Sequence, residues 1–513
     1  MKHSIIYYTL VCLCLLSLAA CKQQYKVPAD FTKTSEKLRI YPDYANVVIP
    51  PNIAPLNFMV RNGGDEFVVQ MKNGSHQLLA GAGSDGKILL DSTEWRNLLN
   101  HSKGHSIAVT VYSHDADGWK AYRPYTITVA AEPIDAYLSY RLIEPGYELY
   151  RQLGLYQRNL TTFDRQTIYE NNRKYSNGEN HCINCHNYKN NDARTMMFHV
   201  RGNMGGTLIA KDGKIEKLNM KTDSIISSAV YPSWHPRRNW LVFSSNKTGQ
   251  TFHLLNKEKI EVIDHASDLV FYNADSHEIS NVLKKPFDME TFPCWNPAGD
   301  RVYYCVAHMP SFAQVPDSLH SLEVVNHYDK MHYNLMSIPF DESTMTFGEP
   351  RLEFDCDAIG KSASVPRVSP DGRYVLFTLG DYGQFHIWHK SSDLYVKDLQ
   401  TGRIYPLTAS NSKDVDSFHS WSSNSRWFVF SSRRDDGSFT RPYIAYFDKN
   451  GQSHKPFMLP QEDPEDNLLL FKSYNVPELS RNAVPYTYDQ FKSVIYGQEG
   501  SPVKYKEIRK NLK

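Results

Sequence analysis

The sequence predicts a mainly β protein, in which a propeller of repeated β-sheets follows a small β-sandwich and a partly helical linker. Two observations predict this class: alternating strand patterns near the N-terminus, and a strand motif that recurs four times later. The composition is that of a folded chain, since 41% of the 513 residues are hydrophobic and 13% are aromatic. The formal net charge of +1 excludes a strongly basic nucleic-acid binder, so we expect no nucleic-acid partner.

Residues 1–20 predict a secretory signal peptide. An apolar run over 5–18 follows a short polar start and is too short for a transmembrane span. It ends in Leu18-Ala19-Ala20-Cys21, which resembles a bacterial lipobox. The resemblance implies cleavage before Cys21 and acylation of its thiol, so that a lipid anchor at Cys21 holds the protein to a membrane. Residues 21–34 are then a tether.

Residues 35–132 predict a small immunoglobulin-like β-sandwich. Runs rich in β-branched and aromatic residues occur at 56–60, 66–69, 106–112 and 125–129, with glycine turns between them. One short helix is predicted over 91–100, because Asp91 and Glu94 have the spacing of a capping box.

Residues 133–190 predict a linker of different composition. Tyr and Arg crowd this stretch, and Pro145-Gly146 interrupts it. Helical pieces are predicted near 136–143 and 147–155. The linker ends in a cysteine motif that begins at Cys182.

A repeated motif organises residues 191–480. Positions 234, 295, 368 and 421, occupied by Trp, Trp, Val and Trp, follow an aromatic or apolar residue and precede a turn and an apolar strand. They lie 61, 73 and 53 residues apart, which is typical of propellers with four-stranded blades. The third copy continues into Ser369-Pro370-Asp371-Gly372-Arg373, and the motif resembles the TolB-like propeller repeat. About six blades, at roughly 50 residues each, fill this span. Residues 481–513 are left as a C-terminal tail.

The sequence Cys182-Ile183-Asn184-Cys185-His186 has the c-type haem attachment pattern. Two thiols in this pattern bond the porphyrin, and the adjacent His binds the iron. Three alternatives remain: a thioredoxin-like pair, which needs a βαβ pattern; a zinc site, which needs a second ligand pair; and a Cys182–Cys185 disulfide, which leaves His186 unexplained. We predict one covalent haem c, attached at Cys182 and Cys185, with His186 as proximal iron ligand.

The strand predicted at 195–201 carries the candidates for the distal iron ligand. Side chains alternate in a strand, so Met196 shares a face with Phe198 and Val200 and is assigned to the core. Met197 and His199 share the other face, and one of them is the candidate distal ligand. A His–Met pair would raise the reduction potential relative to a His–His pair, whereas an open position would admit small ligands.

The chain as a whole resembles bacterial lipoproteins that join a c-type haem motif to a TolB-like propeller. The resemblance rests on 140–147, 182–186, 198–202 and the Trp repeats. It implies a monohaem cytochrome in the cell envelope, which we expect to face the periplasm from the outer membrane of a Gram-negative bacterium. Tyr140 and Arg141 are candidates for haem propionate contacts or for domain packing.

Three functions are compatible with these features. The first is electron transfer, with the propeller as a docking platform for a protein redox partner; the sequence has no nucleophile elbow, phosphate loop or His-Glu-x-x-His motif, which favours a carrier over an enzyme. The second is a haem-based enzyme or sensor that uses the propeller funnel. The third is a haem-free TolB-like binding lipoprotein. Four histidines could line the funnel: His235, His386, His389 and His419. Three cysteines are expected to be buried thiols: Cys294, Cys305 and Cys356.

Overall fold

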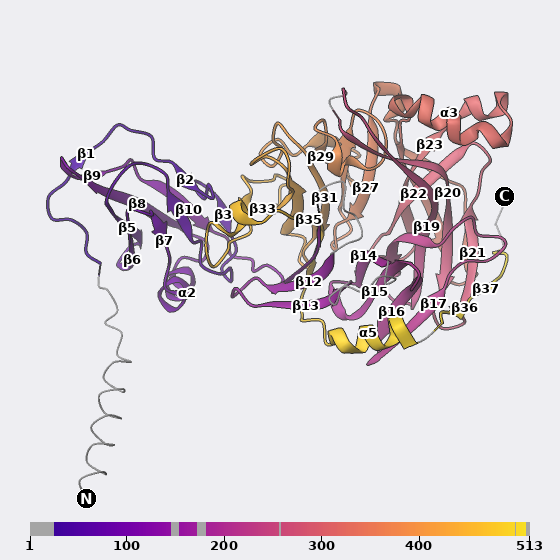
Figure 1. Cartoon of the computed structure of the whole chain (residues 1–513), viewed down its shortest axis with the longest axis horizontal. Coiled ribbons are helices and arrows are strands. Elements are labelled where there is room, and N and C mark those ends of the chain that lie inside the picture. The colour runs from indigo at the N-terminus through magenta and orange to yellow at the C-terminus, as the bar shows by residue number, and fades with distance from the viewer. Residues whose placement is uncertain (1–24, 145–152, 172–180, 256–257, 498, 509–513) are drawn as a thin grey trace, which may run out of the picture.

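The computed structural model describes residues 25–144, 153–171, 181–255, 258–497 and 499–508. The predicted signal peptide and Cys21 lie outside these residues, as does most of the predicted helix at 147–155. A small N-terminal β domain packs against a larger β domain, and the two together form an elongated molecule (Figure 1). None of the helices in the described ranges is long and apolar enough to cross a membrane.

The N-terminal domain consists of two β-sheets and one helix, α2 (Ser92–His101). Asp91 begins the helix as predicted, because its side chain accepts hydrogen bonds from the N–H groups of Thr93 and Glu94. The larger sheet contains β1 (Thr32–Lys33), β3 (Val48–Ile49), β5 (Glu66–Asn73), β6 (His76–Gly83), β8 (Ser106–Asp115), β9 (Gly118–Ala121) and β10 (Tyr125–Val129); the smaller contains β2 (Ile40–Tyr41), β4 (Phe58–Val60) and β7 (Lys87–Ile88).

The two sheets enclose a common core. Phe58 and Ile88 from the smaller sheet belong to the same buried cluster as Val69 and Val109 from the larger, and Trp95 of α2 joins them. The strands predicted at 66–69, 106–112 and 125–129 are confirmed as parts of β5, β8 and β10. Side chains that alternate along these strands point into this core.

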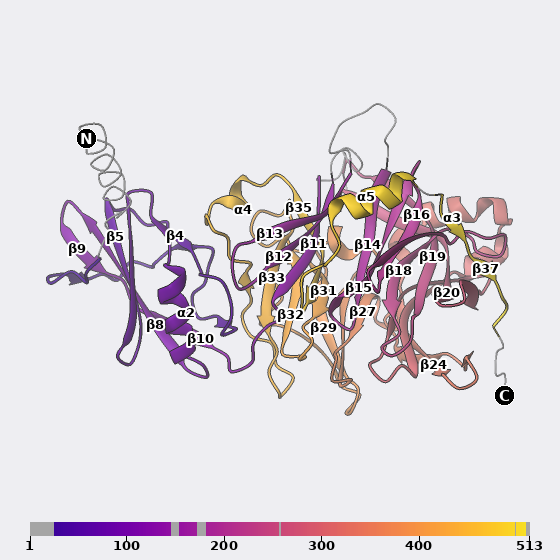
Figure 2. The ribbon, with the colours of Figure 1, turned by 90° about the horizontal axis from the view of Figure 1, so that it is seen from below.

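The larger domain is built from antiparallel sheets arranged around a common centre (Figures 1 and 2). In chain order the strands are β11 (Tyr137–Ile143), β12 (Gly154–Asn159), β13 (Arg165–Glu170), β14 (His181–Lys189), β15 (Asp192–Gly202), β16 (Gly206–Lys211), β17 (Lys214–Asn219), β18 (Ala229–Trp234), β19 (Trp240–Phe252), β20 (Ile260–Asn273), β21 (Glu278–Leu283), β22 (Asp288–Trp295), β23 (Arg301–His308), β24 (Asn334–Asp341), β25 (Thr346–Phe347), β26 (Arg351–Phe354), β27 (Ser362–Val368), β28 (Tyr374–Gly380), β29 (Asp393–Asp398), β30 (Ile404–Pro406), β31 (Asp416–Trp421), β32 (Trp427–Ser432), β33 (Arg441–Tyr446), β34 (Phe457–Met458) and β35 (Ser473–Ser480).

Three sheets contain four strands consecutive in sequence, β14–β17, β27–β30 and β31–β34, and a short C-terminal strand adds a fifth to the first of them. Strands β18–β26 are joined in one larger sheet by a single parallel contact between Ser267 and Met289. We call β14, β18, β22, β27, β31 and β35 the inner strands. Each inner strand contacts the next, and β35 contacts β14, so the inner strands surround a central axis.

The prediction of a partly helical linker over 133–190 is wrong for the described residues. The stretch 137–143 is β11, in which Leu138, Tyr140 and Leu142 are buried, and β12, β13 and β14 follow it. These strands belong to the larger domain. β11 pairs with β35, from Tyr137 opposite Ser480 to Ile143 opposite Ser473. Pairing with so distant a partner overrides any local helical preference.

The predicted C-terminal tail is also structured where it is described. Helix α5 (Tyr488–Gly497) lies across the edge of the larger domain (Figure 2), and its Phe491 packs on Phe198. The short strands β36 (Ser501–Pro502) and β37 (Lys504–Tyr505) pair with β17 and β21. Two further short helices, α3 (His320–Asn326) and α4 (Asp466–Leu469), lie in loops.

Glu290 on β22 carries a carboxyl group that is 1% exposed and has no hydrogen-bond partner among the described residues. Burial, followed by the charges of Asp268 and Asp288, raises its pKa to about 8 from the ordinary 4.5. The folded state therefore keeps a proton that the unfolded chain releases above pH 4.5. The free energy of unfolding falls as the pH rises from 4.5 toward 8.

We expect Glu290→Gln to remove this loss, because the amide carries no titrating proton. Thermal unfolding should show a Tm increase that is larger at about pH 8 than at about pH 5. Glu66→Gln, on the exposed start of β5, is the control and should leave the Tm unchanged at both pH values. An equal Tm shift for Glu290→Gln at both pH values would contradict the assignment.

Candidate functional site

A bulge occurs at the same place in every inner strand. One residue in each has a positive φ between 46° and 56°, and the pairing with the neighbouring strand shifts there. Such backbone is uncommon for residues other than glycine, and a bulge turns side chains toward a new direction. All six bulge residues line one central cavity: Cys185, Tyr231, Phe292, Val365, Phe418 and Val476.

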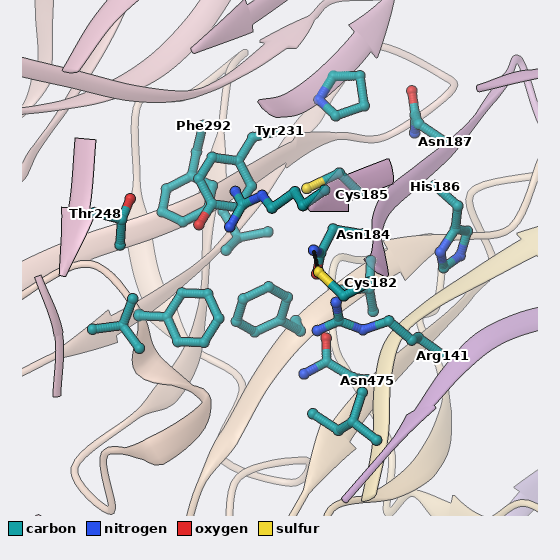
Figure 3. Close-up of a pocket in the computed structure, with 18 of the residues that line it drawn as sticks. Arg141, Cys182, Asn184, Cys185, His186, Asn187, Tyr231, Thr248, Phe292 and Asn475 are labelled. Carbon is teal, nitrogen blue, oxygen red and sulfur yellow. Dashed lines mark hydrogen bonds between the residues drawn. The ribbon is translucent and has the colours of Figure 1, made fainter. Parts of the chain in front are cut away.

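The central cavity has a volume of about 240 Å³. One part of its wall carries Cys182, Cys185 and His186, and the opposite part is aromatic (Figure 3). The aromatic residues come from several elements: Tyr231, Phe292, Phe385, Trp388 and Phe418. The cavity is therefore apolar on one side and rich in thiol and nitrogen groups on the other.

The bulge explains why both cysteines reach the cavity. Residues three apart in a regular strand point to opposite faces. Cys185 has a φ of 56°, and the pairing of β14 with β15 is interrupted between Asn184 and Asn187, so the alternation breaks. The structure thus brings the three predicted attachment and ligand residues, Cys182, Cys185 and His186, to one cavity.

His186 is suited to bind a metal through a lone pair. Its side chain is 2% exposed, and Nε2 has no hydrogen-bond partner in the described part of the chain; Oε2 of Glu478 lies 3.7 Å from it. Burial and the nearby charge of Arg141 lower the pKa of His186 to about 3. The imidazole is therefore neutral at physiological pH. Burial raises the pKa of the Cys182 thiol, whereas the charges of Arg141 and Arg201 oppose that rise.

Three arginines line the same cavity: Arg141, Arg201 and Arg367. No Asp or Glu is among the described residues of its wall. Arg141 donates from Nη1 to the Ile183 carbonyl oxygen at 3.0 Å, which fixes its guanidinium beside the cysteine motif. Sequence reasoning identified Arg141 but missed Arg201, Arg367 and the aromatic wall, because these residues come from separate strands and loops.

The donor set in this cavity fits a c-type haem. Two thiols, a neutral imidazole with a buried unpartnered nitrogen, an apolar wall and arginines for propionates are all present. The enclosed volume of about 240 Å³ is below the roughly 300–1,000 Å³ of typical ligand pockets. Within the described residues, no cluster of three or more His, Cys, Asp or Glu side chains forms a separate metal site.

The candidate distal ligands lie elsewhere on β15. Met197 packs in a cluster with Trp234 and Leu241. His199 is buried, its Nδ1 lies 3.1 Å from the Thr207 hydroxyl, and burial lowers its pKa to about 3. Neither side chain lines the central cavity. Met196 packs in the core with Phe198 and Val200, in agreement with the alternation argument.

A second cavity of about 530 Å³ follows the first along the axis. Along each inner strand, the residues that line the central cavity come first. The residues that line the second cavity follow them and extend into the turn after the strand. We call this second cavity the bowl. It is lined by charged, aromatic and proline side chains that include Arg237, Arg367, Arg481, Trp234, Trp295, Trp421, Pro236, Pro297, Pro370 and Glu478. His186 lines both cavities.

The four histidines predicted near the funnel are all buried, and only His419 lines one of these two cavities, the bowl. The others are held by hydrogen bonds: His235 to the Gly299 carbonyl oxygen, His386 to the Ser364 hydroxyl, and His389 to the Glu261 carboxylate. The thiols of Cys294, Cys305 and Cys356 are buried, as predicted.

No family model and no curated protein matches this sequence. Among solved structures, hydrazine synthase of Kuenenia stuttgartiensis is similar at 12% identity and a TM-score of 0.37, covering 65% of this chain and 48% of that one. The tricorn protease matches at 10% identity and a TM-score of 0.32, covering 80% and 43%. A β-propeller domain of Swd1 from Myceliophteria thermophila matches at 10% identity and a TM-score of 0.28, covering 73% of this chain and 95% of that one.

The chain thus spans less than half the length of the first two proteins. Similarities at this level carry no argument about activity. The fold itself is mainly β and propeller-like.

Proposed function

We propose that the protein is a lipid-anchored monohaem c-type cytochrome that transfers electrons. The observation that carries the proposal is the placement of Cys182, Cys185 and His186 at one cavity by the bulge in β14. The motif has the residue types and order of covalent haem attachment. We further propose that the sheets around the axis are the blades of a six-bladed TolB-like propeller.

Electron transfer suits the arrangement better than catalysis. A c-type haem supplies a one-electron couple that needs no substrate pocket. His186 holds a neutral nitrogen ready for iron, while Arg141 and Arg367 offer positive charge to propionates. The anchor at Cys21 would keep the protein at the membrane, facing the periplasm. The alternative, a haem-based enzyme or sensor, is supported by the aromatic wall, which could accommodate a small ligand.

The test is a visible spectrum of the full protein made in a host with haem c maturation. We expect a sharp reduced α-band and pigment that stays with the protein after acid–acetone extraction. A folded protein without a band would refute the proposal and favour the haem-free binding lipoprotein. Carbon monoxide added to the reduced protein then distinguishes the functions, because rapid binding reports an open or labile distal position and favours the enzyme or sensor.

A further inference from the structure

The bowl has the lining of a protein-docking surface. Arg is among the residues most enriched at interface hot spots, and this cavity carries three arginines. Trp234, Trp295 and Trp421 also line it, but each is at most 5% exposed and packs in the core of a sheet, so the tryptophans make the wall rigid. Five proline side chains from four inner strands or their turns stiffen the wall: Pro232, Pro236, Pro297, Pro370 and Pro477. Trp421 is fixed by a hydrogen bond from its indole Nε1 to the Arg367 carbonyl oxygen at 3.0 Å. A rigid wall loses little entropy when a partner binds.

The charge of the bowl selects the partner. Arg237 is engaged by Glu342 at its rim, at 2.5 Å. Arg367 and Arg481 have no ion pair with a described carboxylate; Arg367 donates to the Pro366 carbonyl and Arg481 to the Asn190 carbonyl. Among the described residues of the lining, Glu478 is the only acidic one, so Arg367 and Arg481 leave the bowl positive even when Glu478 is ionised and Arg237 is paired with Glu342. Guanidinium groups bind carboxylates in bidentate pairs.

The position of the bowl connects it to the haem motif. His186 lines both cavities, and Asn187 and Arg367 do so as well. A partner seated in the bowl would therefore lie next to the residue that is proposed to hold the iron. We propose that the bowl docks an acidic segment of the protein redox partner. This inference rests on the proposed function for the identity of the partner.

The test is a calorimetric titration of the full haem-bearing protein with a deca-glutamate peptide. We expect one peptide per chain and binding that weakens as salt is raised. Arg481→Glu should weaken binding about tenfold, because it places like charges together. The matched control is Arg403→Glu, an exposed arginine outside the bowl that stacks on Tyr405, and it should change nothing.

Several results would overturn the inference. Equal binding of deca-lysine, equally tight binding of free glutamate, or an unaffected Arg481→Glu variant would each do so. Arg481→Gln provides a second variant if reversal prevents folding, and its weaker binding would support the proposal; the backbone N–H of residue 481 still bonds to the Asn191 carbonyl in either variant. If the protein carries covalent haem but does not bind the peptide, only the docking proposal is refuted. If it binds the peptide but carries no haem, the proposed cytochrome function is refuted.

Discussion

Replacement of Cys182 and Cys185 together by Ala is expected to abolish covalent haem attachment. Both thiols line the central cavity, whereas Cys294, Cys305 and Cys356 do not. Wild-type protein should retain one haem per chain after acid–acetone extraction, and the double variant none. Each single variant should retain less haem with a shifted α-band, because one thioether bond remains.

Cys356→Ala is the control for this prediction. Its thiol is fully buried in a core cluster with Cys305 and should leave the haem content unchanged. Circular dichroism of the double variant would show that the β fold persists. If a folded double variant kept extraction-resistant haem, the assignment of the attachment site would be wrong.

Replacement of Trp427 by Ala is expected to cost about 4 kcal/mol in the free energy of unfolding, as for other large-to-small core changes. Trp427 on β32 is 0% exposed and packs on Tyr446, with ring centroids 5.0 Å apart. Its Nε1 donates to the Glu132 carbonyl oxygen at 3.1 Å. It belongs to the buried cluster that continues from the N-terminal domain into the larger domain.

Urea unfolding followed by fluorescence and circular dichroism measures this effect. Because Trp427 couples the two domains, we also expect the variant to unfold in two separated transitions. Trp119→Ala is the matched control: this side chain is partly exposed on β9 and should cost less than about 1 kcal/mol. Equal losses from both substitutions would show that the shared core adds little stability.

The sequence predicted those sheets that begin with a repeat copy. The motifs at Trp234, Trp295 and Trp421 end inner strands, as does Val368 in the third copy. The strand predicted at 195–201 is confirmed as β15. The inner strand of the same sheet, β14, and the sheet of β11–β13 with β35 were missed, because these inner strands lack the tryptophan. The pairing of β11 with β35 is also non-local, and no local periodicity reveals it.

A signal for the site was nevertheless present. The bulge residue lies three positions before the repeat tryptophan or valine and is followed by proline in four of the six inner strands: Tyr231-Pro232, Phe292-Pro293, Val365-Pro366 and Val476-Pro477. Cys185-His186 and Phe418-His419 occupy the same place, with histidine at the proline position. Aligning Cys185 with the repeat would have placed the haem motif on the axis. Arg141 and Arg201 could not be found in this way, because they align with no motif. Arg367 lies in the third copy, at a position where the other copies have Ser233, Cys294 and Ser420.

The pairing of β11 with β35 also determines the order of assembly. Ile143 and Ser473 are 330 positions apart, so β11 emerges during synthesis long before its partner strand. In the interval, one edge of β11 exposes unpaired N–H and C=O groups to other chains. The N-terminal domain shares its core with Leu138 and Tyr140, and it can shelter this strand while the remaining sheets form. We expect closure by β35, a non-local step, to be slow, and a chain that stalls before it to be prone to aggregation.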